Sequence, residues 1–258
     1  MSWVVVTGGG SGIGRGLVHH FSRSNPVLTC GRRLQPLQET QQSATDPGRV
    51  VVVQADIGTE EGRRRLVEAL PASATVGLLV HNAAIGDPAP FTAVDPRHLE
   101  EALRVNVVAP LALTQAFLPA LLAGHGRVLH LGTSVAHNPQ AGTLVYGVTK
   151  SCFHRLYQQL NAEQVGVPCA SLSPGMVDTE GVADHLNKAR QLGLPHVRYF
   201  DEAYDKGLFT DLGSLMEMVD HMLGVDGELY AAKEWKYSVW KGRTSTDPSK
   251  GSFGEKAE

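Results

Sequence analysis

The stretch Trp3-Val4-Val5-Val6-Thr7-Gly8-Gly9-Gly10-Ser11-Gly12-Ile13-Gly14 decides the fold. It opens with an apolar, β-branched run typical of a buried strand, and the segment after the glycines carries Leu17, Val18 and Phe21 at helical spacing. Glycines let the backbone turn tightly and approach a pyrophosphate, whose charge the N-terminal N–H groups of a helix can meet. The sequence therefore predicts strand, phosphate-binding turn and helix, in the order T-G-x-x-x-G-x-G rather than G-x-G-x-x-G.

The same alternation of strand and helix continues along the chain. Apolar runs predict further strands at Pro26 to Cys30, Arg49 to Gln54, Val76 to Val80, Arg127 to Leu131 and Val167 to Leu172. Strands without polar alternation are buried on both faces and need helices on both sides. We therefore expect an α/β fold of the doubly wound Rossmann type, with parallel strands and helices on both faces.

The length and ending of the chain predict its domain organisation. A chain of 258 residues is long for one domain and short for two, so we expect a single catalytic domain over residues 1–241. The segment from Gly242 to Glu258 is rich in Ser, Thr, Lys, Gly and Glu, which predicts a flexible tail. A long helix from about Arg97 to Ala123 should kink or break at Pro110.

Composition excludes several classes of function. The formal net charge of -3, without a basic stripe, argues against nucleic acid as a partner. No signal peptide and no apolar run of about 18 residues is evident, so we expect a cytoplasmic protein without a membrane span. Cys30, Cys152 and Cys169 lack the spacing of a disulfide framework or a zinc site, and we predict no metal.

Two arginines stand where the choice of cofactor is made. In an NAD site an acid about 20 residues beyond the glycines accepts bonds from the ribose 2′-hydroxyl. Here the second predicted strand ends in Gly31-Arg32-Arg33, and the first acid afterwards is Glu39. Guanidinium groups suit a 2′-phosphate through charge-assisted bonds, so NADP(H) is favoured over NAD(H); the alternative is two solvated residues at a helix start.

Tyr146 and Lys150 lie four residues apart, which places both side chains on one face of a helix. A nearby ammonium favours the phenolate, so we expect a tyrosine pKa lowered toward working pH, where general acid-base catalysis is most effective. Such a pair also occurs by chance on solvated helices. Asn106 falls in an apolar stretch and needs partners, either in a structural bond or in a proton path.

The polar clusters that follow successive strands should meet in one crevice, because ligands bind beyond the carboxyl ends of the strands in open α/β sheets. With these residues in hand, the chain resembles the short-chain dehydrogenase/reductase family over roughly residues 3 to 232. The matching pieces are Thr7-Gly8-x-x-x-Gly12-x-Gly14, Asp56, Asn82-Ala83-Ala84, Asn106, Tyr146-x-x-x-Lys150 and Pro174-Gly175-x-x-x-Thr179. Their joint occurrence in this order is highly specific.

The resemblance implies about seven parallel strands, a nicotinamide cofactor and a role for each matching residue. Tyr146 would be the general acid or base, Lys150 would lower its pKa and hold the nicotinamide ribose, and Asn106 would anchor a water of the proton relay. The implied cofactor-binding residues are Gly8, Ser11, Gly12, Ile13, Gly14, Arg32, Arg33, Asp56, Ile57, Asn82, Ala83, Ala84, Tyr146, Lys150, Pro174, Gly175, Val177 and Thr179. Among them, Asp56 would bond the adenine, Asn82 would line its ribose and Thr179 would hold the carboxamide.

The hydroxyl that orients the substrate is left open between two neighbours. The family places a serine thirteen residues before the tyrosine, and counting back from Tyr146 gives Thr133, with Ser134 one residue late. We favour Thr133 and keep Ser134 as the alternative. His130 stands where the family usually has an asparagine, and we interpret it as a packed histidine.

The same resemblance sets the expected activity. We expect an NADP-dependent carbonyl reductase or alcohol dehydrogenase acting on a small molecule, loosely like sepiapterin or benzil reductases. The alternative is a catalytically silent, NADP-binding regulatory or interaction protein of the same fold. Residues 180–207 should form a substrate lid, the least regular part of the chain, and relatives lead us to expect a homodimer or homotetramer.

Overall fold

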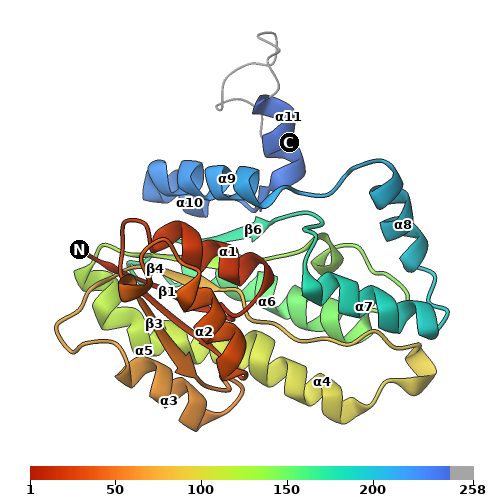
Figure 1. Cartoon of the computed structure of the whole chain (residues 1–258), viewed down its shortest axis with the longest axis horizontal. Helices are drawn as coiled ribbons and strands as arrows, with labels where there is room; N and C mark the ends of the chain where they lie inside the picture. The colour runs from red at the N-terminus through yellow and green to blue at the C-terminus, as the bar shows by residue number, and fades with distance from the viewer. Residues whose placement is uncertain (245–258) are drawn as a thin grey trace.

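The computed structural model describes residues 1–244, and its centre is one sheet of seven parallel strands. The strands are β1 (Trp3–Thr7), β2 (Val27–Gly31), β3 (Val50–Gln54), β4 (Val76–His81), β5 (Arg127–Leu131), β6 (Cys169–Ser173) and β7 (Trp235–Lys236). They lie in the order β3-β2-β1-β4-β5-β6-β7, so the chain reverses direction across the sheet between β1 and β4 (Figure 1). The predicted doubly wound fold is confirmed. In such folds the ligand crevice lies where the strand order reverses, which here is between β1 and β4.

Helices cover both faces of this sheet. The chain forms α1 (Gly12–Phe21), α2 (Leu34–Gln42), α3 (Glu60–Glu68), α4 (Pro96–Leu103), α5 (Ala109–Ala123), α6 (Leu144–Ala162), α7 (Glu180–Gln191), α8 (Val197–Asp205), α9 (Leu212–Gly224), α10 (Gly227–Ala231) and α11 (Tyr237–Thr244). Short helical turns lie at η1 (Pro47–Arg49), η2 (Phe91–Ala93) and η4 (Ser134–Ala136), and a π-helical turn at η3 (Arg104–Val108). Figure 1 shows α1 and α9 together on one side of the sheet and α3 and α5 on the other.

The two faces have separate hydrophobic cores because successive strand residues point to opposite sides. On β1, Val4 and Val6 pack with α1 and α9, whereas Val5 packs with α5 and α6 through side chains such as Phe117 and Tyr157. All five side chains are buried. This explains why the strands read as continuous apolar runs instead of alternating ones.

Residues 96–123 form one continuous helix with an irregular turn in its middle. The helix does not break at Pro110 as predicted; its irregularity is the π-helical turn η3, which ends at Val108, and Pro110 lies in the first turn of α5. By length and composition this helix could cross a bilayer, contrary to our expectation from the sequence. Leu113, Phe117 and Leu121 are nevertheless buried against the sheet, as in the core helix of a globular protein.

The C-terminal third corrects two expectations. Residues 180–207 are not the least regular part of the chain, because they hold the helix pair α7 and α8. Helix α11 runs to Thr244, past the predicted start of the tail at Gly242, and residues 245–258 lie outside the described part. The last strand, β7, has only two residues and pairs with β6.

Candidate active site

The glycine turn between β1 and α1 is held by close backbone packing. Gly8 and Gly12 have φ angles of 75° and 53°, a region that side chains disfavour. A Cβ on Gly14 would lie 2.2 Å from the carbonyl oxygen of Gly8. Ser11 precedes α1, whose first turn has no acidic residue, and Ile13 follows within that turn. The N–H groups at this helix start are therefore suited to an anion.

The end of β4 is bonded to this turn through Asn82. Its amide Nδ2 donates to the carbonyl oxygens of Thr7 and Gly8, at 2.9 and 3.1 Å. The Thr7 hydroxyl in turn accepts from the backbone N–H groups of Asn82 and Ala83, at 3.0 and 3.1 Å. Asn82 thus has a structural role in setting the turn, and its predicted contact with a ribose stays a prediction, as does that of Ala84.

The residues predicted to bind the 2′-phosphate and the adenine of the cofactor lie at the carboxyl ends of β2 and β3. Arg32 and Arg33 follow β2 with exposed side chains, and the Arg32 guanidinium lies 4.0 Å from Glu101, with 59% of its side chain accessible. After β3, the Asp56 carboxylate accepts a bond of 2.9 Å from the Gly58 N–H, while Ile57 is buried. Both arginines are therefore free to turn toward an anion.

Tyr146 and Lys150 share one face of α6, as their spacing predicted. The Lys150 ammonium lies 5.7 Å from the centre of the Tyr146 ring and donates a bond of 2.8 Å to the carbonyl oxygen of Leu131 at the end of β5. Only 4% of Lys150 is exposed, and burial lowers its pKa to about 7.

The prediction of a lowered tyrosine pKa is wrong for this structure. Burial raises the pKa of Tyr146 to about 12, and the residue is half-buried. Desolvation disfavours the charged phenolate. Tyr146 is accordingly protonated at neutral pH.

The two candidate hydroxyls lie beyond the end of β5. The Thr133 side chain is half-buried and accepts from the Val135 N–H at 3.4 Å, which caps η4, whereas Ser134 is exposed. Because β5 ends at Leu131, the alternation of strand side chains does not decide between them. Both remain candidates for the substrate-orienting group.

Asn106 lies in the π-helical turn and is buried. Its Oδ1 accepts from the Ile85 N–H at 2.9 Å, and its Nδ2 donates to the Ile85 carbonyl at 2.7 Å and to the Thr149 hydroxyl at 2.9 Å. The side chain therefore ties the loop after β4 to α6, next to Lys150. This is the structural bond that we considered from the sequence, and the proton-path role stays a prediction.

The segment after β6 crosses the glycine turn. A Cβ on Gly12 would lie 3.1 Å from the Thr179 methyl group, so Thr179 sits directly against the turn, and its hydroxyl caps α7. The Pro174 carbonyl accepts from the Thr210 hydroxyl at 2.7 Å, Gly175 has a φ of 75°, and Val177 is buried. The glycine turn and the segment from Pro174 to Thr179 thus form two walls of one crevice.

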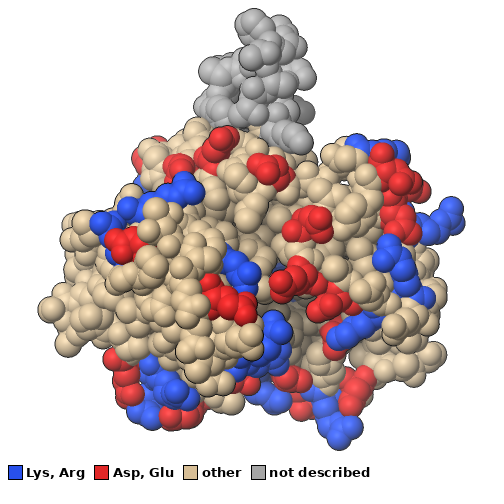
Figure 2. All heavy atoms as spheres, viewed as in Figure 1, with Lys and Arg blue, Asp and Glu red and all other residues tan. Residues whose placement is uncertain are grey.

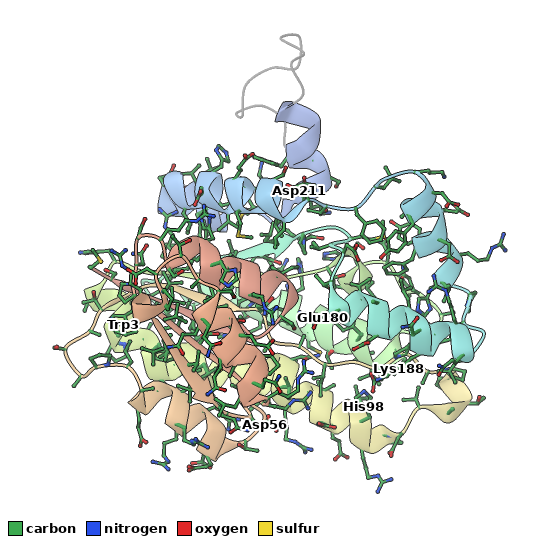
Figure 3. The ribbon with its side chains drawn as sticks, viewed as in Figure 1. Trp3, Asp56, His98, Glu180, Lys188 and Asp211 are labelled. Atoms are coloured by element: carbon green, nitrogen blue, oxygen red, sulfur yellow. The ribbon has the colours of Figure 1, made fainter. Side chains whose placement is uncertain are left out.

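Helices α7 and α8, which span the predicted lid, are bonded to the loops around this crevice. The Lys188 ammonium on α7 lies 2.8 Å from the Asp87 carboxylate, and the Asp87 N–H donates to His98 on α4 at 3.1 Å (Figure 3). His196 Nδ1 donates to the Ala141 carbonyl at 3.0 Å, and its Nε2 is hydrogen-bonded to His185 Nε2 at 2.9 Å. Figure 2 shows the surface hollowed between the side of α1 and α2 and the side of α7.

Sequence reasoning missed several residues of this region. Arg15 donates to the Gly10 carbonyl at 2.6 Å and braces the turn, and a Cβ on Gly86 would lie 2.8 Å from that of Tyr146. His81 and His130 lie fully buried behind Lys150, with ring centres 5.1 Å apart, and His130 stacks on Phe153 at 4.1 Å. The packed histidine at 130 was expected; its buried histidine neighbour was not, because only the strand register brings the two together.

Comparisons with known proteins agree with this arrangement. A family model described as short chain dehydrogenase matches residues 2–190. An uncharacterized oxidoreductase of Staphylococcus epidermidis is 31% identical over 180 residues, which cover 68% of this chain and 77% of the relative. The NADP-dependent 3-hydroxy acid dehydrogenase YdfG of Escherichia coli is 28% identical over 67% of this chain and 72% of its own.

Solved structures share the fold. The crystal structure of the KRED1-Pglu enzyme matches with a TM-score of 0.80 at 22% identity, over 91% of this chain and 100% of that one. The closed form of serine dehydrogenase complexed with NADP+ matches with a TM-score of 0.73 at 22% identity, over 91% and 93% of the two chains.

Proposed function

The chain belongs to the short-chain dehydrogenase family, and from this premise we propose that it is an NADP(H)-dependent enzyme that interconverts a small carbonyl compound and its alcohol. Membership makes the protein an oxidoreductase of this family. The observation that carries the finer proposal is the common face of α6 on which Tyr146 and Lys150 meet, with Lys150 bonded to the end of β5.

The residues present fit a dinucleotide cofactor. The tight glycine turn and the N-terminus of α1 offer a phosphate site, and the exposed Arg32 and Arg33 offer charge for a 2′-phosphate. A bound nicotinamide would supply or accept the hydride. NADP(H) is favoured further by the names of two relatives, the NADP-dependent YdfG and a serine dehydrogenase solved with NADP+.

Tyr146 acts as the proton donor in the proposed reduction. Burial keeps its phenol protonated at neutral pH, and the alkoxide oxygen formed on a reduced carbonyl is a much stronger base than a phenolate, so transfer runs downhill. Thr133 or Ser134 would hold the same oxygen by a hydrogen bond. Lys150, buried beside the phenol, would favour the phenolate that this transfer leaves behind.

Replacing Tyr146 by Phe tests the proposal. We expect the rate of NADPH oxidation with a panel of small aldehydes and ketones to fall by roughly 10²–10⁴-fold, the usual contribution of a general acid. NADPH binding, followed by fluorescence titration, should be retained. If the wild-type protein binds NADPH but turns over none of these substrates, the catalytically silent alternative is favoured instead.

We also propose a homo-oligomer. Apolar side chains are exposed on the outer side of η3, α5 and α6, namely Val108, Leu111, Leu122 and Val148. Exposed apolar side chains are frequent on surfaces that a second copy covers. Light scattering at micromolar concentration should give the mass of a dimer or tetramer, and Leu111→Glu should lower it; a wild-type monomer would contradict the proposal.

A further inference from the structure

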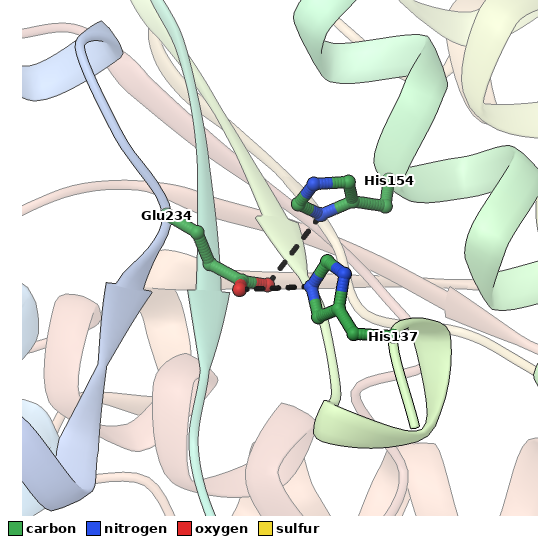
Figure 4. A group of neighbouring side chains, drawn as sticks. All are labelled: His137, His154 and Glu234. Carbon is green, nitrogen blue, oxygen red and sulfur yellow. Dashed lines mark hydrogen bonds and ion pairs between the residues drawn. The ribbon is translucent and has the colours of Figure 1, made fainter. Parts of the chain in front are cut away.

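A second group of titratable side chains lies on another side of α6, outside the proposed active site. His137 follows η4, His154 lies on α6 one turn after Lys150, and Glu234 directly precedes β7. Figure 4 shows both imidazole rings turned toward the Glu234 carboxylate. His137 Nε2 lies 3.0 Å from Oε2 of Glu234, and His154 Nδ1 lies 3.5 Å from Oε1.

The carboxylate of this group is buried and well positioned. Only 8% of the Glu234 side chain is exposed, and Oε1 also accepts from the Ser171 hydroxyl at 3.3 Å. The pairing of β7 with β6 fixes the backbone next to it. A buried carboxylate needs a positive partner, and here two imidazole rings converge on it.

The site also has an unsatisfied donor atom and open space. The Nδ1 atom of His154 is buried and has no hydrogen-bond partner within the described residues. A cavity of about 420 Å³ borders the group and is lined by all three residues, with Tyr157 and Gln158 among the others. A small ligand could therefore reach the point at which the three side chains meet.

We propose that His137, His154 and Glu234 form a zinc-binding site with three protein ligands and one position open to the cavity. The three ligand atoms lie within 4.8 Å of one another. In a tetrahedral site with metal–ligand bonds of about 2.1 Å, neighbouring ligand atoms are about 3.4 Å apart. The two nitrogen–oxygen separations, 3.0 Å to Oε2 and 3.5 Å to Oε1 of Glu234, are close to that value, and no pair of ligand atoms is more than 4.8 Å apart, so rotations of the rings and of the carboxylate would complete the site.

The donor set selects the metal. Two imidazole nitrogens and one carboxylate suit zinc, whereas magnesium and calcium prefer sites made of oxygen alone. The Gln158 amide nitrogen lies 3.2 Å from His154 Nε2, and the amide oxygen accepts from Arg155 at 3.1 Å. When a metal binds Nδ1, the proton of His154 moves to Nε2, and the Gln158 amide would turn to present its oxygen there, giving up its exposed bond to Arg155.

One nearby positive charge, the ammonium of Lys236, would repel a bound metal ion. The Lys236 ammonium lies 3.8 Å from the Glu234 carboxylate, but 53% of its side chain is exposed. Solvent can therefore take up this ammonium when an ion binds. The bound ion would tie α6 to the segments before β7 and after β5, and it should stabilise the folded chain because the unfolded chain lacks the arrangement.

Titration of EDTA-treated, tag-free protein with ZnCl₂ tests the site directly. We expect calorimetry to show one zinc ion bound per chain, and the melting temperature to rise with Zn²⁺ but not with Mg²⁺. Co²⁺ in the same site should give the strong visible absorption of a four-coordinate ion. This readout is independent of turnover, so it distinguishes failure of the metal site from failure of the proposed oxidoreductase.

Variants locate the ion. His137→Ala and Glu234→Gln should each weaken zinc binding more than tenfold. His20→Ala is the matched control, because it removes another histidine–carboxylate pair, with 2.7 Å between His20 and Asp220, and should bind zinc like wild type. Circular dichroism in EDTA establishes that each variant is folded, and His137, on an exposed turn, carries the test if Glu234→Gln does not fold. Absence of saturable zinc binding, or equal affinity in wild type and the His137 variant, would overturn the proposal.

Discussion

Lys150 shows how one buried charge governs its neighbours. Its ammonium lies between the Tyr146 and Phe153 rings and is bonded to a strand carbonyl, with almost no contact with water. Burial makes it unusually ready to lose a proton, with a pKa of about 7, and the same burial raises the pKa of the phenol. Desolvation therefore acts on both members of the pair in the direction that favours their neutral forms.

Arg32 and Arg33 carry the prediction on cofactor choice. Because charge-assisted hydrogen bonds contribute about 1.5–3 kcal/mol, removal of either guanidinium should raise the KM for NADPH roughly tenfold or more. The KM for NADH, which has no 2′-phosphate, should change little. Steady-state kinetics of Arg32→Ala and Arg33→Ala with both cofactors measures this.

Arg97→Ala is the matched control for these variants, since Arg97 is an exposed arginine on α4 whose partner is Asp95. It should leave both KM values unchanged. The argument from the arginines fails if wild type and both variants use the two cofactors equally well.

At this scale the sequence predicted which residues meet but not the balance of forces among them. The spacing of Tyr146 and Lys150 was sufficient to place them on one face. The pKa direction for Tyr146 was wrong because burial depends on the loop at Gly86 and on β5, which sequence spacing does not reveal. The proposed zinc ligands could not be predicted, because His137, His154 and Glu234 come from separate elements with no common motif.

Among the elements, the glycine turn is the least tolerant of change. Gly14→Ala should lower the free energy of unfolding by roughly 1–3 kcal/mol and abolish tight NADPH binding, because the new Cβ would lie 2.2 Å from a backbone oxygen that cannot move freely. Urea unfolding and fluorescence titration with NADPH provide the two measurements.

Gly181→Ala provides the comparison, since a Cβ at this position in α7 meets nothing within 4 Å. Replacing a helical glycine by alanine should stabilise the protein by up to about 1 kcal/mol and leave cofactor binding unchanged. Equal NADPH affinity in the two variants would show that the geometry of the turn does not matter.

Elements were predicted best where burial is strongest. The strands β1 and β5 begin and end where their apolar runs do, β3 and β4 differ by one residue at one end, and β2 and β6 differ by one or two residues at both ends. The two-residue strand β7 is too short to show a period. Helices α7 and α8 do carry a helical pattern, but the charged and aromatic side chains of residues 180–207 led to the interpretation of an irregular lid. The π-helical turn η3 was visible only as a break near Pro110.

Across the whole molecule, two buried histidines that are uncharged at neutral pH should control how stability depends on pH. His81 and His130 are fully buried on adjacent strands at the centre of the sheet, and His81 bonds Thr114 of α5 at 2.9 Å. Burial, and secondly Lys150, lowers the pKa of His81 to about 3. Burial also lowers the pKa of His130 well below its usual value, and the neighbouring His81 and Lys150 act in the same direction.

Acid should therefore unfold the protein early. Below pH 6.5 the unfolded chain binds protons at both histidines, whereas the folded chain does not. The free energy of unfolding therefore decreases as the pH falls toward the folded pKa values, by about 1.4 kcal/mol per pH unit for each histidine. Urea unfolding in EDTA at pH 7 and pH 5 should differ by about 2 kcal/mol for each of them. His130→Asn removes one titrating group, so its stability should depend on pH less steeply over this range, by about 1.4 kcal/mol per pH unit. His125→Asn, a surface change, should keep the wild-type slope. Identical slopes in wild type and His130→Asn would show that His130 binds its proton in the folded state as readily as in the unfolded one.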